Sequence, residues 1–212
     1  MTGRATVHIV DDDAAIRDAL AWLLASRGLA TQAWDSGEAI LAALPLAEPA
    51  CIILDVRMTG LSGPEVFARL RAAGCAAPVI FLTGHADVPV AVQALKTGAF
   101  DFVEKPFNDN QIVDLALAAI AARAEARAVQ EAQRLLAERL AALTAREHEV
   151  LVLMLEGLPN KQIADRLAIA TRTVEVHRAR VLHKTGARNA LELAAQCALA
   201  GVTLASRAGG AG

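Results

Sequence analysis

Aromatic residues are scarce in this chain. Of its 212 residues only 3 % are aromatic, with five Phe, two Trp and no Tyr. Strands of all-β proteins are enriched in aromatic and β-branched residues, whereas alanine is the strongest helix former. Because apolar residues, many of them alanine, still make up 55 % of the chain, the composition disfavours an all-β fold and favours helices.

Cysteine is also rare, and two kinds of long segment are missing. Cys51, Cys75 and Cys197 are scattered and form no C-x-x-C, which argues against a disulfide framework or a zinc knuckle. No leader with basic residues before an apolar stretch begins the chain, and no apolar run is long enough to span a membrane. We therefore expect a cytoplasmic protein without a membrane partner.

Neither sign of charge dominates, but the two signs are unevenly distributed. Residues 1–122 contain 8 Lys or Arg against 14 Asp or Glu, residues 123–143 contain 4 against 3, and residues 144–212 contain 9 against 6. An acidic first part and a basic last part predict two domains with different partners. We place the first domain at 1–122, a helical linker at 123–143, the second domain at 144–203 and a disordered tail at 204–212.

The first part alternates short apolar runs with helical patterns. Such an alternation is typical of a doubly wound parallel sheet. We therefore predict an α/β fold with five parallel strands, in which ligands bind beyond the carboxyl ends of the strands. The predicted strands are 7–10, 31–34, 51–55, 78–83 and 100–104, and the predicted helices are 14–27, 36–44, 63–73 and 88–97.

Helix can continue past the first domain, because no Gly or Pro occurs from Asn108 to Glu156. An apolar stripe at helical spacing runs from Val129 to Leu143. The stripe either lies on one domain or also pairs with a second copy of the chain, and the sequence does not decide between the two. The capping-box pattern T-A-R-E at 144–147 indicates that a new helix begins there.

Acidic residues follow the ends of the predicted strands. Asp11, Asp12 and Asp13 come after the first strand, Asp55 ends the third, Thr83 ends the fourth and Lys105 follows the fifth. In a doubly wound sheet these ends converge on one crevice. Clustered carboxylates suit Mg²⁺, and a metal with an ammonium and a hydroxyl can hold a phosphoryl group, with Asp55 as candidate nucleophile. Any single acid could instead be a helix N-cap, which is what we expect of Asp13.

These segments resemble the receiver domain of two-component response regulators of the FixJ type. The resemblance covers about residues 4–122 and rests on V-H-I-V-D-D-D, L-D-V-R-M-T-G-L-S-G, F-L-T-G-H-A-D-V-P and F-V-E-K-P-F. It implies that Asp55 accepts phosphate from a sensor histidine kinase. It also implies that Asp11, Asp12 and the Arg57 carbonyl serve Mg²⁺, that Thr83 and Lys105 bind the phosphoryl group, that Phe102 is the switch aromatic, and that the Lys105–Pro106 bond is cis.

One position departs from the family pattern. The family usually has Pro after the Met of D-x-x-M-P, whereas Thr59 stands here. Proline would stiffen that loop. The departure leaves the fold prediction intact but makes the lifetime of the phosphoryl group uncertain.

The last part of the chain reads as all-helical. Helices are predicted at 145–156, 160–168, 171–185 and 189–200, and the short break A-I-A between the second and third fits a helix-turn-helix. A polar and basic third helix suits the major groove of DNA. The alternative is a protein-binding domain whose basic face is merely solvated.

Sequence motifs favour DNA. L-T-A-R-E-H-E-V-L, N-K-Q-I-A-D-R-L and T-R-T-V-E-V-H-R-A-R-V-L-H-K resemble the LuxR-type DNA-binding domain, over roughly 140–203. Ala170 stands where the family often has a capping Ser, so Thr171 or the backbone must cap the third helix. Glu175 has an alternative role as an i, i+3 partner of Arg178, and His177 one as an ordinary helix-surface residue. The candidate phosphate contacts are Lys161, Thr171, Arg172, Thr173, His177 and Arg180, and the candidate base contacts are Glu175, Val176 and Arg178.

Together the two parts predict a response regulator that is phosphorylated on Asp55 and binds promoter DNA as a homodimer. RNA polymerase is an expected further partner. We expect no enzymatic activity beyond slow autodephosphorylation. An aspartate-nucleophile phosphohydrolase and a phosphorylation-controlled adaptor that binds protein remain as alternatives.

Overall fold

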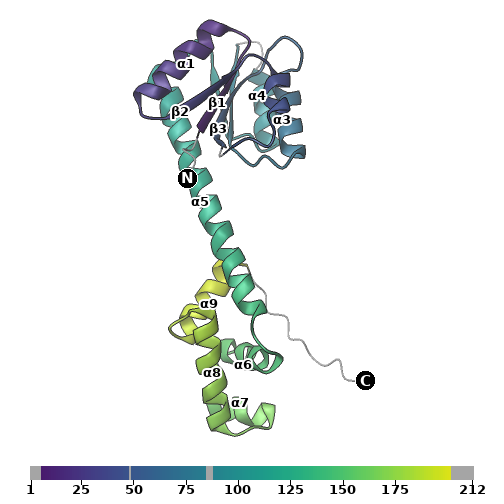
Figure 1. Cartoon of the computed structure of the whole chain (residues 1–212), viewed down its shortest axis with the longest axis vertical. Helices are drawn as coiled ribbons and strands as arrows, with labels where there is room; N and C mark the ends of the chain where they lie inside the picture. The colour runs from purple at the N-terminus through teal and green to yellow at the C-terminus, as the bar shows by residue number, and fades with distance from the viewer. Residues whose placement is uncertain (1–5, 48, 85–87, 202–212) are drawn as a thin grey trace. The chain divides into compact units, whose positions relative to one another are not determined.

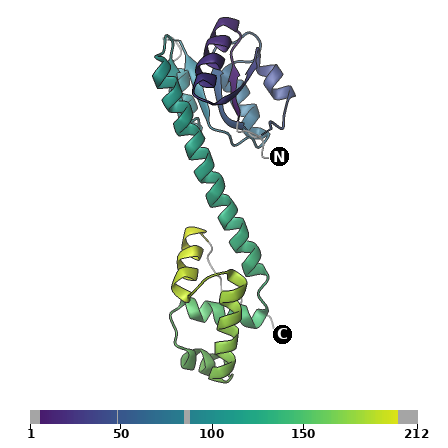
Figure 2. The ribbon, with the colours of Figure 1, turned by 60° about the vertical axis from the view of Figure 1, so that its left-hand side comes forward.

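A computed structural model describes residues 6–47, 49–84 and 88–201, without the side chains of residues 88, 89 and 91. The tail predicted at 204–212 lies outside the described residues. Contacts divide the chain into one unit at Met1–Glu125 and another at Ala126–Gly212. Helix α5 (Asp109–Ala141) is continuous from the first unit into the second, as Figure 2 shows, so the prediction that helix continues past the first domain is confirmed.

The first unit is built on a five-stranded parallel sheet, as predicted. Its strand order is β2-β1-β3-β4-β5. This order puts the carboxyl ends of β1, β3, β4 and β5 side by side, with β2 at one edge of the sheet and β5 at the other. The strands are β1 (Thr6–Val10), β2 (Ala30–Trp34), β3 (Pro49–Asp55), β4 (Val79–Thr83) and β5 (Asp101–Glu104), and the connecting helices are α1 (Ala14–Ser26), α2 (Gly37–Ala42), α3 (Gly63–Ala72) and α4 (Val88–Lys96).

Helices cover both faces of this sheet (Figure 1). Side chains alternate between the two faces of a strand, so Val7 and Ile9 of β1 join a core with α1 and α5. Val10 joins the opposite core, which contains residues of α2, α3 and α4. With both faces covered, the central strands β1, β3 and β4 are buried along nearly all of their length, which explains why they read as continuous apolar runs, whereas the edge strands β2 and β5 are more exposed.

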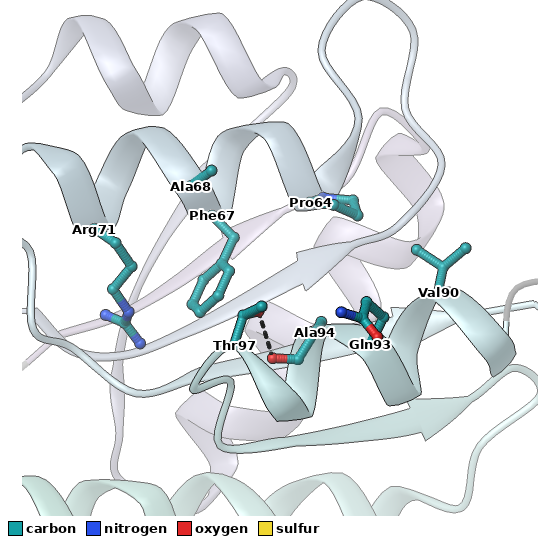
Figure 3. Close-up of a pocket in the computed structure, with 8 residues that line it drawn as sticks. All are labelled: Pro64, Phe67, Ala68, Arg71, Val90, Gln93, Ala94 and Thr97. Carbon is teal, nitrogen blue, oxygen red and sulfur yellow. Dashed lines mark hydrogen bonds between the residues drawn. The ribbon is translucent and has the colours of Figure 1, made fainter.

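The end of α3 is fixed by one arginine. Arg71 places its guanidinium 4.6 Å from the centroid of the Phe67 ring and donates from Nη1 to the carbonyls of Cys75 and Ala77, at 2.6 and 2.8 Å. Figure 3 shows Arg71 and Phe67 on one side of a shallow groove and Gln93 of α4 on the other. The groove has a volume of about 390 Å³, and its Arg71 end secures the turn that leads into β4.

The second unit is all-helical, and its helix positions agree closely with the prediction. Its helices are α6 (Ala145–Leu155), α7 (Asn160–Leu167), α8 (Thr171–Thr185) and α9 (Ala190–Leu199). The capping box that begins α6 is present: Thr144 Oγ1 accepts from Glu147 N, and Glu147 Oε2 accepts from Thr144 N at 2.9 Å. Lys184 of α8 contacts the same carboxylate at 2.6 Å, which ties α8 to the start of α6.

The apolar stripe of the linker divides into two parts. Leu136 and Leu140 are buried in one core with residues of α6 to α9. Val129, by contrast, is 48 % exposed. The second half of the stripe therefore packs on the helices of the second unit, whereas Val129 in the first half is largely exposed.

Candidate functional site

Three acidic residues meet at the carboxyl edge of the sheet. Asp11 directly follows β1 and Asp55 is the last residue of β3, and both are buried, whereas Asp12 is exposed. One carboxylate oxygen from each lies within 4.8 Å of the others. The side chains that the sequence placed at neighbouring strand ends are therefore brought together, because parallel strands carry these ends to the same edge.

Lys105 joins two of these carboxylates. Its Nζ lies 2.8 Å from Asp11 Oδ2 and 2.8 Å from Asp55 Oδ1. Burial raises the pKa of Asp55, and the hydrogen bond and charge of Lys105 oppose that rise. Lys105 N also donates to the carbonyl of Thr83 at 2.7 Å, so the backbone after β5 is attached to the end of β4.

The other residues predicted for this site surround it at different depths. Thr83 is fully buried, with Oγ1 donating to the carbonyl of Gly84 at 3.0 Å. Phe102 is half-buried against the core that contains Phe81. Arg57 is exposed in the loop after β3. The Lys105–Pro106 bond is cis, as the resemblance implied.

Asp13 is not part of the cluster. Its Oδ1 accepts from Ala15 N at 2.8 Å, which caps α1. The prediction that this acid is a helix N-cap is confirmed. Two of the three consecutive acids therefore belong to the site and the third begins a helix.

The remaining carboxylate, Asp12, is held by Thr59. Both the backbone N and the side-chain Oγ1 of Thr59 donate to Asp12 Oδ2, each at 2.8 Å. These two hydrogen bonds lower the pKa of Asp12, and the bond from the backbone N has the larger effect. The residues are 47 positions apart in the chain, so no local spacing pattern could have predicted this contact, although Thr59 was visible as a departure from the family pattern.

The donor set fits a hard divalent cation. Three carboxylates and the backbone carbonyls of the adjacent loop are oxygen ligands of the kind that Mg²⁺ prefers. The sole ammonium near the cluster in the described part of the chain, Lys105, contacts only two of the three carboxylates. A divalent cation would offset the remaining repulsion.

A second candidate site lies on α8. Val174, Val181 and Thr185 are buried, whereas Thr171, Arg172, Thr173, Val176 and Arg180 are exposed. Lys161, near the start of α7, is exposed as well. The helix therefore buries one face and exposes most of the predicted contact residues, whereas Arg178 and His177 are half-buried. An exposed polar face is what a helix that enters a DNA groove requires.

Two predicted contact residues have surroundings that the sequence did not reveal. Glu175 Oε2 pairs with Arg172 Nη1 at 3.0 Å, so the i, i−3 partner takes the place of the Arg178 partner considered as an alternative. His177 is half-buried, and among the described residues its Nδ1 has no hydrogen-bond partner. That nitrogen is covered and cannot reach a phosphate without movement of the side chain.

The N-terminus of α8 lacks a side-chain cap, as predicted. Ala170 is the N-cap residue, and its carbonyl accepts from Thr173 N at 2.9 Å and Val174 N at 3.2 Å. The preceding turn contains Ala168 with φ of 52°, the left-handed conformation that favours glycine. The start of α8 is therefore capped by backbone groups, and Arg146 Nη2 of α6 donates to the carbonyl of Leu167 at the end of α7, at 2.6 Å.

Models of known domain families match both units. The family described as "Response regulator receiver domain" matches residues 7–117, and the family described as "Bacterial regulatory proteins, luxR family" matches residues 141–196. The chain is a response regulator. Its second unit is a LuxR-type DNA-binding domain.

Known proteins resemble this response regulator over nearly its whole length. It is 63 % identical over 191 residues to the C4-dicarboxylate transport transcriptional regulatory protein DctR of Rhodobacter capsulatus, an alignment covering 89 % of this chain and 97 % of that protein. It is 46 % identical over 203 residues to the transcriptional regulatory protein FixJ of Azorhizobium caulinodans, covering 95 % and 96 %. Such matches make it a two-component transcriptional regulator.

Solved structures agree with this assignment. The response regulator StyR superimposes with a TM-score of 0.80 at 38 % identity and covers 91 % of this chain and 98 % of its own. Full-length FixJ from B. japonicum gives a TM-score of 0.61 at 40 % identity and covers 95 % and 100 %. Within the described ranges, no helix of this response regulator is both long and apolar enough to cross a bilayer.

Proposed function

We propose that Asp55 is the phosphoacceptor and that a sensor histidine kinase supplies the phosphoryl group. The contact of Lys105 Nζ with both Asp11 and Asp55 is the observation that carries this proposal. A carboxylate beside an ammonium, next to two further carboxylates and the buried Thr83, is the arrangement that holds a phosphoryl group and its metal ion.

The transfer makes one bond and breaks another. A carboxylate oxygen of Asp55 bonds to phosphorus, and the bond from phosphorus to the histidine nitrogen of the kinase breaks, with its electron pair left on nitrogen. Asp11, Asp12, Asp55 and the Arg57 carbonyl are the proposed ligands of Mg²⁺, which when bound neutralises charge on the phosphoryl oxygens. Lys105 neutralises further charge, and Thr83 donates its hydroxyl to a phosphoryl oxygen.

The proposed output is regulated binding of promoter DNA. Exposed residues of α8 and Lys161 meet DNA, and phosphorylation favours a homodimer that brings two such helices to one site. RNA polymerase is the proposed partner at the promoter. Hydrolysis of the aspartyl phosphate by water is slow, and it is the only enzymatic step that we propose.

Labelling of Asp55 tests the proposal. Acetyl phosphate with Mg²⁺ should add the mass of one phosphoryl group to the full chain, measured by intact-mass spectrometry. Asp55→Asn should abolish the addition, and Asp12→Asn should raise the Mg²⁺ concentration that it requires. Asp13→Asn is the matched control, because Asn also caps helices, and it should label as the parent does. Full labelling of Asp55→Asn, or turnover of a generic phosphate ester, would contradict the proposal.

A further inference from the structure

The three carboxylates of the receiver site are stabilised in two different ways. Asp11 and Asp55 share the ammonium of Lys105, and Asp11 Oδ1 also accepts from Asp13 N at 2.9 Å. Asp12 Oδ2 receives both of its hydrogen bonds from Thr59, a neutral residue. Asp12 is thus the carboxylate whose negative charge is stabilised by hydrogen bonds from Thr59.

Proline at position 59 could make neither of these bonds. Its ring nitrogen carries no hydrogen and its side chain has no hydroxyl. The two donors therefore exist only because this chain has Thr where the family usually has Pro.

We propose that Thr59 is a positioning residue that sets the affinity of the receiver for Mg²⁺ by stabilising the metal-free form of Asp12. The inference rests on the metal site proposed above. Donors that stabilise a free carboxylate make it a weaker base, and they oppose a metal ion for the same reason that they oppose a proton. Mg²⁺ also requires a nearly ideal geometry, so a carboxylate fixed toward the loop must turn or share its oxygens.

Removing the donors one at a time should therefore tighten Mg²⁺ binding in steps. Thr59→Val keeps the shape of the side chain and the backbone N–H but loses the hydroxyl, and Thr59→Pro loses both donors. A net hydrogen bond corresponds to roughly a two- to tenfold change in an equilibrium constant. The dissociation constant for Mg²⁺ should fall about two- to tenfold in Thr59→Val and further in Thr59→Pro.

Two readouts on the full chain measure this effect. The first is the dissociation constant for Mg²⁺ itself, from isothermal titration with MgCl₂. The second is the Mg²⁺ concentration that gives half of the maximal rate of labelling by acetyl phosphate. If Thr59 supported only the fold, its variants would alter thermal stability but would not lower both values. If it acts as proposed, both values should fall from the parent to Thr59→Val and again to Thr59→Pro. Thr97→Val, which removes a hydroxyl bonded to Ala94 O on α4, is the matched control and should change neither value.

The outcomes separate this inference from the metal site. If Asp12→Asn binds Mg²⁺ as tightly as the parent, the proposed metal site fails. If Asp12→Asn weakens Mg²⁺ binding while Thr59→Val leaves it unchanged or weakens it, the site stands and the inference about Thr59 is overturned. Thr59→Val decides the matter even if Thr59→Pro does not fold.

Discussion

At the scale of single residues, the receiver unit contains a histidine that is buried against a tryptophan. His8 of β1 is 1 % exposed. Its Nδ1 accepts from Trp34 Nε1 at 3.0 Å, and its ring stacks on that of Trp34. Within the described residues His8 Nε2 has no partner. Burial lowers the pKa of His8 from 6.5, because the charged form loses its hydration.

This histidine should make the stability of the first unit depend on pH. Below about pH 6.5 the unfolded chain binds a proton that the folded unit does not, so stability falls as the pH is lowered until the folded pKa is reached, by at most about 1.4 kcal/mol per pH unit. His8→Gln should flatten this dependence between about pH 7 and pH 5. Urea unfolding followed by tryptophan fluorescence measures it, because Trp22 and Trp34 both lie in the first unit. Equal slopes for parent and variant would refute the assignment.

On α8, two residues should affect DNA binding in different ways. Losing Glu175, a candidate base contact, should weaken the free energy of binding to the preferred site by about 1–3 kcal/mol and relax the sequence preference at one base position. Losing Lys161, a candidate phosphate contact, should weaken binding to all DNA sequences alike. It should also reduce by about one the slope of the logarithm of the binding constant against the logarithm of salt concentration. Binding of Glu175→Ala and Lys161→Ala to a randomised site library at several salt concentrations distinguishes the two.

The ion pair of Glu175 with Arg172 provides the control for that experiment. An exposed i, i+3 pair contributes only a few tenths of a kcal/mol to the helix. Arg172→Ala breaks the pair but leaves the carboxylate, so it should keep the preference that Glu175→Ala loses. If Glu175→Ala leaves sequence preference untouched, its role is structural and α8 reads DNA by other residues.

Contacts between strand ends could be predicted, but contacts between loops could not. Asp11, Asp55 and Lys105 meet because each is fixed to the end of a strand, and the parallel order of the strands follows from sequence pattern. Thr59 meets its partner Asp12 through loop conformation, and Trp34 of β2 meets His8 of β1 through the packing of particular side chains between neighbouring strands. Such contacts leave no periodic signal, so the sequence could not place them.

At the scale of whole elements, helix and strand ends follow local chemistry. The capping box at Thr144 could be predicted because capping depends on neighbours in the chain. Gly186 after α8 has φ of 75°, the left-handed conformation in which glycine is favoured. The division of the linker stripe into an exposed and a buried part could not be predicted, because Val129 and Leu136 follow the same helical pattern but differ in what packs against them.

The uncapped start of α8 offers a prediction about that element. Ala170→Ser supplies an oxygen for the free N–H groups of the first turn and should stabilise the second unit by about 1 kcal/mol. Hydrogen exchange of the α8 amides should slow accordingly. Ala170→Val, which adds bulk without an acceptor, is the control and should give no such protection. Equal exchange rates in the two variants would mean that the backbone at Ala170 already satisfies the turn.

At the scale of the whole molecule, phosphorylation should change the assembly state. Helices α4 and α5 of the receiver unit expose Val92 and Leu117, at 41 % and 44 %, and the proposed switch residues Thr83 and Phe102 lie on β4 and β5. The face that we expect to change on phosphorylation is built from α4, β5 and the start of α5, from about Asp87 to Ala122, and Asp87 itself lies outside the described residues. Acetyl phosphate should raise the sedimenting mass toward a dimer, and Leu117→Glu should weaken that response.

The control for sedimentation is Asp55→Asn, which should remain at the mass of the untreated chain. An unchanged mass for the parent across the micromolar range would contradict phosphorylation-driven dimerisation. A dimer that is present before treatment would instead indicate an interface at the exposed first half of the linker stripe, around Val129.

That phosphorylation of Asp55 controls DNA binding by the second unit is tested most directly by one affinity measurement. The dissociation constant of the full chain is determined for a DNA site selected from the randomised library, with and without acetyl phosphate and Mg²⁺ at fixed salt. We predict that phosphorylation tightens binding by about tenfold, within the usual range of coupling between two sites, and that Asp55→Asn shows no response. Equal affinities in the two states of the parent, or an equal response from Asp55→Asn, would contradict it.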